Sequence, residues 1–213
     1  MGRELVRGLD HWCLWMGDDD FNPADISKSS VLKKRVEAVR EMRLGSKKKA
    51  TQRSADTPYL FQEDHQPDCA YVGIPRVVSE TRKFYTAAHL DPDVIAGDKV
   101  YVAVDPEGLL FGLISSSMFI TWQRAVGGRL KSDLNFANTL TWNTFPVPEL
   151  DEKTRQRIIK AGKKVLDARA LPPERSLAEH YNPLAMAPEL IKAHDALDRE
   201  VDKAFGCLLY TSP

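Results

Sequence analysis

The feature that most constrains the fold is a strongly apolar segment, residues 109–126, interrupted mainly by three consecutive serines. It is too long for an ordinary strand and lacks the alternation of apolar and polar residues that a half-exposed strand shows, so we predict a mostly buried helix. Gly127-Gly128 directly afterwards predicts its end. A helix of this kind needs other elements to cover it. The 213 residues, 43% of them hydrophobic, are enough to build that core.

Short runs rich in β-branched and aromatic residues predict strands elsewhere in the chain. Residues 70–74 and 99–104 are two such runs, separated by segments rich in turn-forming residues, and we expect them in one mixed sheet. Residues 11–16 contain two tryptophans and predict a third, buried strand.

The sequence after Pro148 changes to helical patterns. Asp151 is a predicted N-cap, and a later helix is expected to start at Pro188 and to end just before Gly206. The predicted fold class is therefore α+β: a mixed-sheet domain over residues 1–148, followed by a small all-helical domain over residues 149–206. Residues 207–213 are left out of this prediction as a tail.

Basic residues are concentrated near the N-terminus, although the whole chain carries 30 basic and 30 acidic residues. Between Lys28 and Arg53 there are ten basic and two acidic side chains, and Leu32, Val36, Val39 and Met42 recur at helical spacing. We predict a helix, capped by Ser29 or Ser30, in a strip that faces a polyanion and includes Lys47, Lys48 and Lys49. The alternative is an ordinary solvated helix face.

The sequence lacks the motifs of common catalytic sites. It has no GxGxxG, P-loop, HExxH, GxSxG or CxxC pattern, and the acidic, histidine and cysteine residues of 63–69 crowd into one loop without a second cluster. We therefore predict no catalytic residue, no metal and no cofactor in this chain. Three widely spaced cysteines and the absence of a long apolar run predict a cytoplasmic protein without a membrane partner.

Polar and apolar residues alternate just after the double glycine. Lys131, Asp133 and Asn135 alternate with Leu134 and Phe136, which predicts an extended segment with its polar side chains on one side, about 7 Å apart. A lysine suits the O6 and N7 acceptors of guanine, and an aspartate suits the N4 amine of its partner cytosine. The segment could read one G·C pair, or the Lys/Asp pair could be exposed without a function.

Five further residues have side chains that can donate to phosphate groups. Ser79, Arg82 and Lys83 follow a predicted strand, and Arg124 and Arg129 stand on either side of the double glycine. Arg76 is equally compatible with a structural ion pair.

Several sequence stretches, in the same order, resemble the target-recognition region of MmeI-like enzymes. These stretches are Trp12-Cys13-Leu14-Trp15, Tyr71 to Lys83, Phe111 to Ser116, Gly128-Arg129-Leu130-Lys131-Ser132-Asp133, Trp142-Asn143-Thr144-Phe145-Pro146, and matches that continue to Phe205-Gly206. The family consists of single-chain class I adenine-specific DNA methyltransferases, many of them combined restriction-modification proteins.

The resemblance implies that residues 1–148 are a DNA target-recognition domain and residues 149–206 the family's C-terminal helical domain. It places residues 131, 133 and 135 among the base-reading positions, although Leu134 to Ala137 differ from the family's usual aromatic and arginine residues. It further implies sequence-specific binding of double-stranded DNA on behalf of an adenine-N6 methyltransferase.

In the family, S-adenosylmethionine binds a preceding catalytic domain, which we expect in the same polypeptide or in a separate chain. We therefore expect this chain alone to be inactive as a methyltransferase. The alternatives are a protein-interaction or inhibitory fragment and an incomplete gene product without a role of its own.

Overall fold

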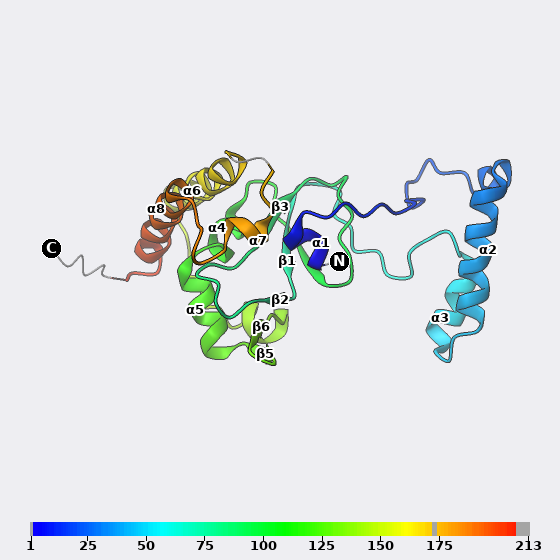
Figure 1. Cartoon of the computed structure of the whole chain (residues 1–213), viewed down its shortest axis with the longest axis horizontal. Helices are drawn as coiled ribbons and strands as arrows, with labels where there is room; N and C mark the ends of the chain where they lie inside the picture. Colours follow the sequence, from blue (N-terminus) through cyan, green and yellow to red (C-terminus); the bar gives the residue numbers. More distant parts are fainter. Residues whose placement is uncertain (1, 172–173, 208–213) are drawn as a thin grey trace. The chain divides into compact units, whose positions relative to one another are not determined.

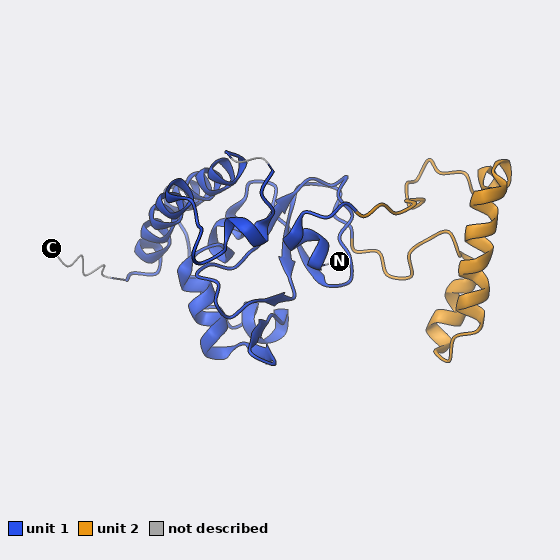
Figure 2. Cartoon of the chain, in the orientation of Figure 1, with its two compact units in different colours: residues 1–10, 66–213 blue, residues 11–65 orange. Residues whose placement is uncertain are grey.

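The computed structural model describes residues 2–171 and 174–207 and divides the chain into two compact units. One unit contains residues 1–10 and 66–213, and the other contains residues 11–65, as Figure 2 shows in two colours.

The larger unit contains both sheets and most of the helices (Figure 1). Its elements are α1 (Gly2–Arg7), β1 (Tyr71–Pro75), β2 (Val77–Val78), β3 (Ala88–Leu90), β4 (Val100–Val104), α4 (Leu109–Ile114), α5 (Ser117–Val126), β5 (Gly128–Leu130), β6 (Asp133–Asn135), the π-helical turn η3 (Asn138–Trp142), α6 (Glu152–Ala170), α7 (Leu177–His180) and α8 (Pro188–Ala204).

The two strands predicted near residues 70–74 and 99–104 are confirmed as β1 and β4, which pair with each other. The prediction of one mixed sheet is wrong, because the described strands form two antiparallel sheets in the orders β3-β1-β4 and β2-β6-β5. Between β1 and β2 the chain passes from one sheet to the other through Arg76 alone. The α+β class is confirmed.

The apolar segment 109–126 is helical, as predicted, but it forms two helices with a break at Ser115-Ser116. The Ser116 hydroxyl donates to the Leu113 carbonyl (2.7 Å) and accepts from the Phe119 amide (3.2 Å), so it ends one helix and caps the next. Helix α5 ends at Val126, before the double glycine.

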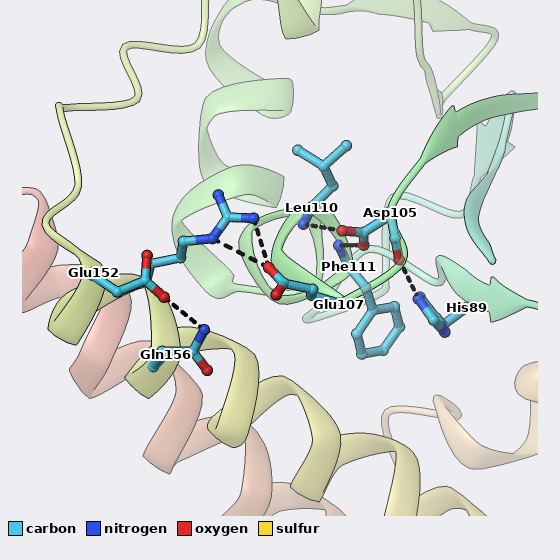
Figure 3. A network of polar contacts seen from close by, with 8 residues as sticks. His89, Asp105, Glu107, Leu110, Phe111, Glu152 and Gln156 are labelled. Atoms are coloured by element: carbon cyan, nitrogen blue, oxygen red, sulfur yellow. Dashed lines mark hydrogen bonds and ion pairs between the residues drawn. The ribbon is translucent and has the colours of Figure 1, made fainter. Parts of the chain in front are cut away.

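A buried carboxylate holds the first of these helices against the sheet (Figure 3). Asp105 accepts from the amides of Leu110 (3.0 Å) and Phe111 (2.7 Å), two donors of the first turn of α4 that have no partner inside the helix. The Asp105 carbonyl lies 2.7 Å from Nε2 of His89, which belongs to β3. The turn after β4 thereby connects the sheet to the helical layer.

Helices α6 and α8 have the predicted starts. Asp151 caps α6 by accepting from the Thr154 amide (2.6 Å), and Pro188 is the first residue of α8. Their apolar residues join one continuous core with the sheets and with α4 and α5. The backbones of α4 and α6 are close, since a Cβ built on Gly162 of α6 would lie 3.2 Å from the Cα of Gly112 in α4. The apolar faces of α6 and α8 are therefore buried against elements that precede residue 148.

The smaller unit is built on η1 (Pro23–Lys28), α2 (Ser30–Leu44), α3 (Lys49–Arg53) and η2 (Ser54–Asp56). The predicted helix with a Ser29 cap is confirmed. Met42, however, is 61% exposed, and the neighbouring Arg43 is buried instead. Arg43 faces inward because its guanidinium donates to the carbonyls of Ser54 (2.6 Å), Thr57 (3.0 Å) and Leu60 (2.7 Å).

The predicted buried strand at residues 11–16 is wrong. These residues have no regular secondary structure, and Trp12 is 89% exposed. Trp15 packs instead on Phe61 and donates to the Asp18 carboxylate (2.9 Å). An apolar run becomes a strand only if another strand is available to pair with it, and the described part of residues 11–65 contains none.

Candidate nucleic-acid interface

The predicted base-reading residues lie on a short β-hairpin formed by β5 and β6. The strands pair Gly128 with Asn135 and Leu130 with Asp133, so that Lys131 and Ser132 form a two-residue turn. Leu134 and Phe136 are buried, while Asp133 and Asn135 are only half-buried on the alternate side. The period-two pattern is therefore confirmed from Asp133 to Phe136.

Lys131 departs from that pattern. Its φ of 57° is in the left-handed region, and its side chain is exposed in the turn that joins the two strands. Two-residue hairpin turns need a positive φ to match the twist of their strands, and here a lysine adopts it where glycine or asparagine is usual. The prediction that Lys131 continues the extended segment is wrong, because Lys131 belongs to the turn.

The loop after β2 packs against this hairpin. The Arg82 amide donates to the Ser79 carbonyl (3.1 Å), which closes a turn with Glu80 in its second position. The Glu80 amide donates to Asp133 Oδ1 (3.4 Å), and the Glu80 carboxylate lies 3.5 Å from Nη1 of Arg129. The segments 79–83 and 124–135, far apart in sequence, are thus brought together by the tertiary structure.

The arginines that we predicted as phosphate contacts have partners within the protein. Arg124 donates to the carbonyls of Glu80 (3.3 Å) and Arg82, and Arg129 donates to the Ser132 carbonyl (2.9 Å). Arg82 donates to the Ala178 carbonyl (2.9 Å), and its partial burial lowers the pKa of its guanidinium. These three side chains hold the loop and the hairpin in place.

The remaining predicted residues are less constrained. The Ser79 hydroxyl lies 3.2 Å from that of Thr81, and Lys83 is exposed. Lys47, Lys48 and Lys49 are exposed at the start of α3, in the smaller unit.

Glu80 and Gln123 are two residues that the sequence analysis missed. Gln123 is completely buried, and its Nε2 donates to the Asn135 carbonyl (3.2 Å). This hydrogen bond connects α5 to the last residue of β6. A glutamine inside an apolar helix was a signal that could have identified it, because a buried amide needs partners. Glu80 had no such signal, since its contacts come from residues more than forty positions away.

No helix in the described ranges 2–171 and 174–207 is both long enough and apolar enough to cross a membrane. In the same ranges, no three His, Cys, Asp or Glu side chains gather as a metal site would require.

The family comparison agrees with this arrangement. The protein-family model described as "MmeI, target recognition domain" matches residues 1–149 of the sequence. The family model described as "MmeI, C-terminal domain" matches residues 150–212. The chain belongs to the MmeI family. The resemblance predicted from the sequence is thereby confirmed.

Two relatives of this MmeI-family chain are much longer than it is. It is 34% identical to "DNA methyltransferase A" of Bacillus subtilis (strain 168), over 95% of this chain and 23% of that protein. It is 38% identical, with a TM-score of 0.91, to a solved "Type IIL restriction-modification enzyme MmeI in complex with DNA", over 99% of this chain and 28% of that one. The chain thus spans about a quarter of the length of these relatives.

The hydrophobic core of this MmeI-family chain is not divided at residues 149 and 150, where one family model ends and the other begins. Residues 66–148 and 149–206 share one hydrophobic core, whereas residues 11–65 form a separate compact unit. A domain boundary after residue 148 stays a prediction, and most of the predicted tail, residues 208–213, lies outside the described residues.

Proposed function

We propose that this chain selects the double-stranded DNA sequence on which a restriction-modification methyltransferase acts. The observation that carries the proposal is the β5–β6 hairpin of a target-recognition domain, with an exposed lysine in its turn and polar side chains on one side of β6. The structural relative named above was solved with DNA. A two-stranded ribbon is narrow enough to enter the major groove.

The hairpin side chains match the chemistry of base edges. The Lys131 ammonium donates to O6 and N7 of a guanine, and the Asp133 carboxylate accepts from the N4 amine of the paired cytosine. The Asn135 amide both donates and accepts, which suits an adenine. Because Lys131 lies in the turn and Asp133 in the strand, the two approach the pair from different backbone positions.

Lysine side chains supply contacts to the DNA backbone. Lys83 beside the hairpin, and Lys47, Lys48 and Lys49 on the smaller unit, are exposed and donate to phosphates in any sequence. Arg82, Arg124 and Arg129 act mainly by holding the loop and the hairpin, and present their remaining donors to phosphates. The Ser79 hydroxyl, which contacts only its neighbour Thr81 in the loop, donates to a phosphate.

Methyl transfer belongs to another part of the enzyme. A catalytic domain, in the same polypeptide or in a separate chain, transfers the methyl group from S-adenosylmethionine to N6 of adenine in the cytoplasm. The residues of this chain do not fit that cofactor, because the sequence contains no GxGxxG pattern, the glycine-rich loop typical of nucleotide cofactor sites. We therefore assign no step of the transfer to this chain.

A second candidate function is docking to another protein. The smaller unit exposes Trp12 (89%), Val31 (65%) and Met42 (61%), which are apolar enough to contact a protein surface. The steepness of salt dependence distinguishes the two functions, because DNA binding weakens strongly with salt and apolar docking does not.

The test is selection of duplexes from a random library by the purified chain. We expect an enriched sequence containing one G·C pair whose orientation inverts in the double variant Lys131→Glu with Asp133→Arg. Each good contact discriminates by about 1 to 3 kcal/mol, so either single change weakens selection at that pair. The matched control is Lys163→Glu with Asp167→Arg on the exposed side of α6, which makes the same charge changes. Enrichment of an unchanged sequence by the hairpin variant would contradict the assignment of these two residues.

A further inference from the structure

We propose that Glu80 is a positioning residue for base recognition, and that its backbone N–H orients the Asp133 carboxylate. The proposal deepens the function proposed above and rests on it. Glu80 lies outside the hairpin, in the loop after β2, and reaches the hairpin only through the fold.

Three chemical groups of Glu80 bind three residues of the segment 124–133. Its N–H donates to Asp133 Oδ1 (3.4 Å), its carbonyl accepts from Arg124 Nη2 (3.3 Å), and its carboxylate pairs with Arg129 (3.5 Å). One turn residue thus contacts the end of α5, the first strand of the hairpin and the second strand.

The Asp133 contact leaves this carboxylate able to bind a base. An ionised carboxyl group accepts at two oxygens and about four lone-pair positions, and the Glu80 amide occupies one of them. The remaining positions are available to an amine of a base. A carboxylate that is already oriented loses less side-chain freedom when it binds, which sharpens discrimination.

The Arg129 contact fixes the other side of the turn. Its guanidinium contacts both the Glu80 carboxylate and the carbonyl of Ser132, the second residue of the hairpin turn. Both charges of this ion pair are nearly half exposed, so the pair adds little stability and acts mainly on geometry. At 3.4 Å the amide contact to Asp133 is also long for a hydrogen bond, and its removal is expected to change orientation more than folding.

A pair of variants separates the N–H of Glu80 from its side chain. Glu80→Ala keeps the N–H and removes the carboxylate, whereas Glu80→Pro removes both. Proline suits the second position of a turn closed by a bond from Arg82 to Ser79, so Glu80→Pro is compatible with the local backbone.

The readout is the ratio of affinities for the preferred duplex and for the duplex with the G·C pair inverted. We expect Glu80→Pro to lower this ratio about tenfold, as Asp133→Ala does, and Glu80→Ala to keep it within about threefold of the wild type. Discrimination at the other base pairs should be unchanged. In the Asp133→Ala background, Glu80→Pro should have no further effect, because its target is gone.

A second measurement does not depend on the proline variant. The NMR shift of the Glu80 amide proton should move upfield in Asp133→Ala, which removes the carboxylate that accepts from it, and stay unchanged in Asp167→Ala on α6. A wild-type chain without any sequence preference would overturn the proposed function. Three outcomes would overturn the inference alone. Glu80→Pro could keep the wild-type preference, it could lower the affinity ratio further in the Asp133→Ala background, or the Glu80 amide shift could be the same with and without the Asp133 carboxylate.

Discussion

His194 shows how one residue of the core depends on its surroundings. It lies on α8, stacks on Phe84 with ring centroids 3.8 Å apart, and has Nε2 2.7 Å from the Tyr181 hydroxyl. Tyr181 in turn accepts from Arg169, which also donates to the Ala87 carbonyl (2.7 Å). Burial, and next the nearby Arg169 charge, lower the pKa of His194 to about 3.

This lowered pKa predicts a loss of stability in mild acid. In the unfolded chain His194 is expected to have a pKa of about 6.5, so below that pH the unfolded protein binds a proton that the folded protein does not. The free energy of unfolding therefore decreases as the pH is lowered from about 6.5 to about 3. Between pH 7 and pH 5 this residue should remove about 2 kcal/mol. Urea unfolding at both pH values should show the loss in the wild type and a smaller one in His194→Gln. Equal pH dependence in both proteins would contradict the assignment.

At the level of secondary-structure elements, the connection between α5 and β5 determines where the hairpin stands. The two glycines there look equivalent in sequence, but their surroundings differ. A Cβ on Gly127 would lie 2.0 Å from Gln123 Nε2 and 2.5 Å from the Gln123 carbonyl, while a Cβ on Gly128 would lie 3.6 Å from the Asn135 carbonyl. Gly127 has an ordinary φ of −75°, so packing and not backbone conformation requires glycine there.

We therefore predict different effects for alanine at these two positions. Gly127→Ala should destabilise the chain by about 1 to 3 kcal/mol, because Gln123 must move away from the Asn135 carbonyl. Gly128→Ala, the matched control, should change stability by less than about 0.5 kcal/mol. Denaturant unfolding measures both. Similar losses in the two variants would show that Gln123 is not the constraint.

At the scale of the whole molecule, charge is distributed unevenly between the two compact units. The excess of basic residues between Lys28 and Arg53 falls entirely within the smaller unit, residues 11–65. This unit has little apolar core of its own, since Ala55 is its only fully buried hydrophobic residue among those described. Its surface is therefore better suited to binding than to supporting the fold.

We predict that this unit contributes sequence-independent affinity for DNA. Replacing Lys47, Lys48 and Lys49 by alanine should reduce the slope of log affinity against log salt by about 0.9 for each phosphate that the variant no longer neutralises. The control is the triple alanine variant of Lys160, Lys163 and Lys164, exposed residues of α6, which removes the same charge. Binding titrations between about 50 and 200 mM salt would be decisive. Identical slopes in the two triple variants would exclude a specific role for the basic strip.

The sequence was sufficient for features that depend on neighbouring residues. The Asp151 cap, the Pro188 start of α8, the end of α5 before Gly127 and the alternation from Asp133 to Phe136 all follow from side chains within a few positions. The ordered stretches that resemble MmeI-like enzymes determined the family in the same way.

Contacts between residues far apart in the sequence were determined only by the tertiary structure. The pairing of Val78 with Leu134, the inward turn of Arg43 and the contact between Glu80 and Asp133 join residues 11 to 56 positions apart. Local periodicity reports which face of an element is apolar, but not which carbonyl, carboxylate or strand will meet it. The same limit explains why residues 11–16, which have no strand to pair with in their unit, do not form the predicted strand. The sequence therefore determined the family and most of the helices and strands, and tertiary packing determined the geometry of the candidate DNA-reading surface.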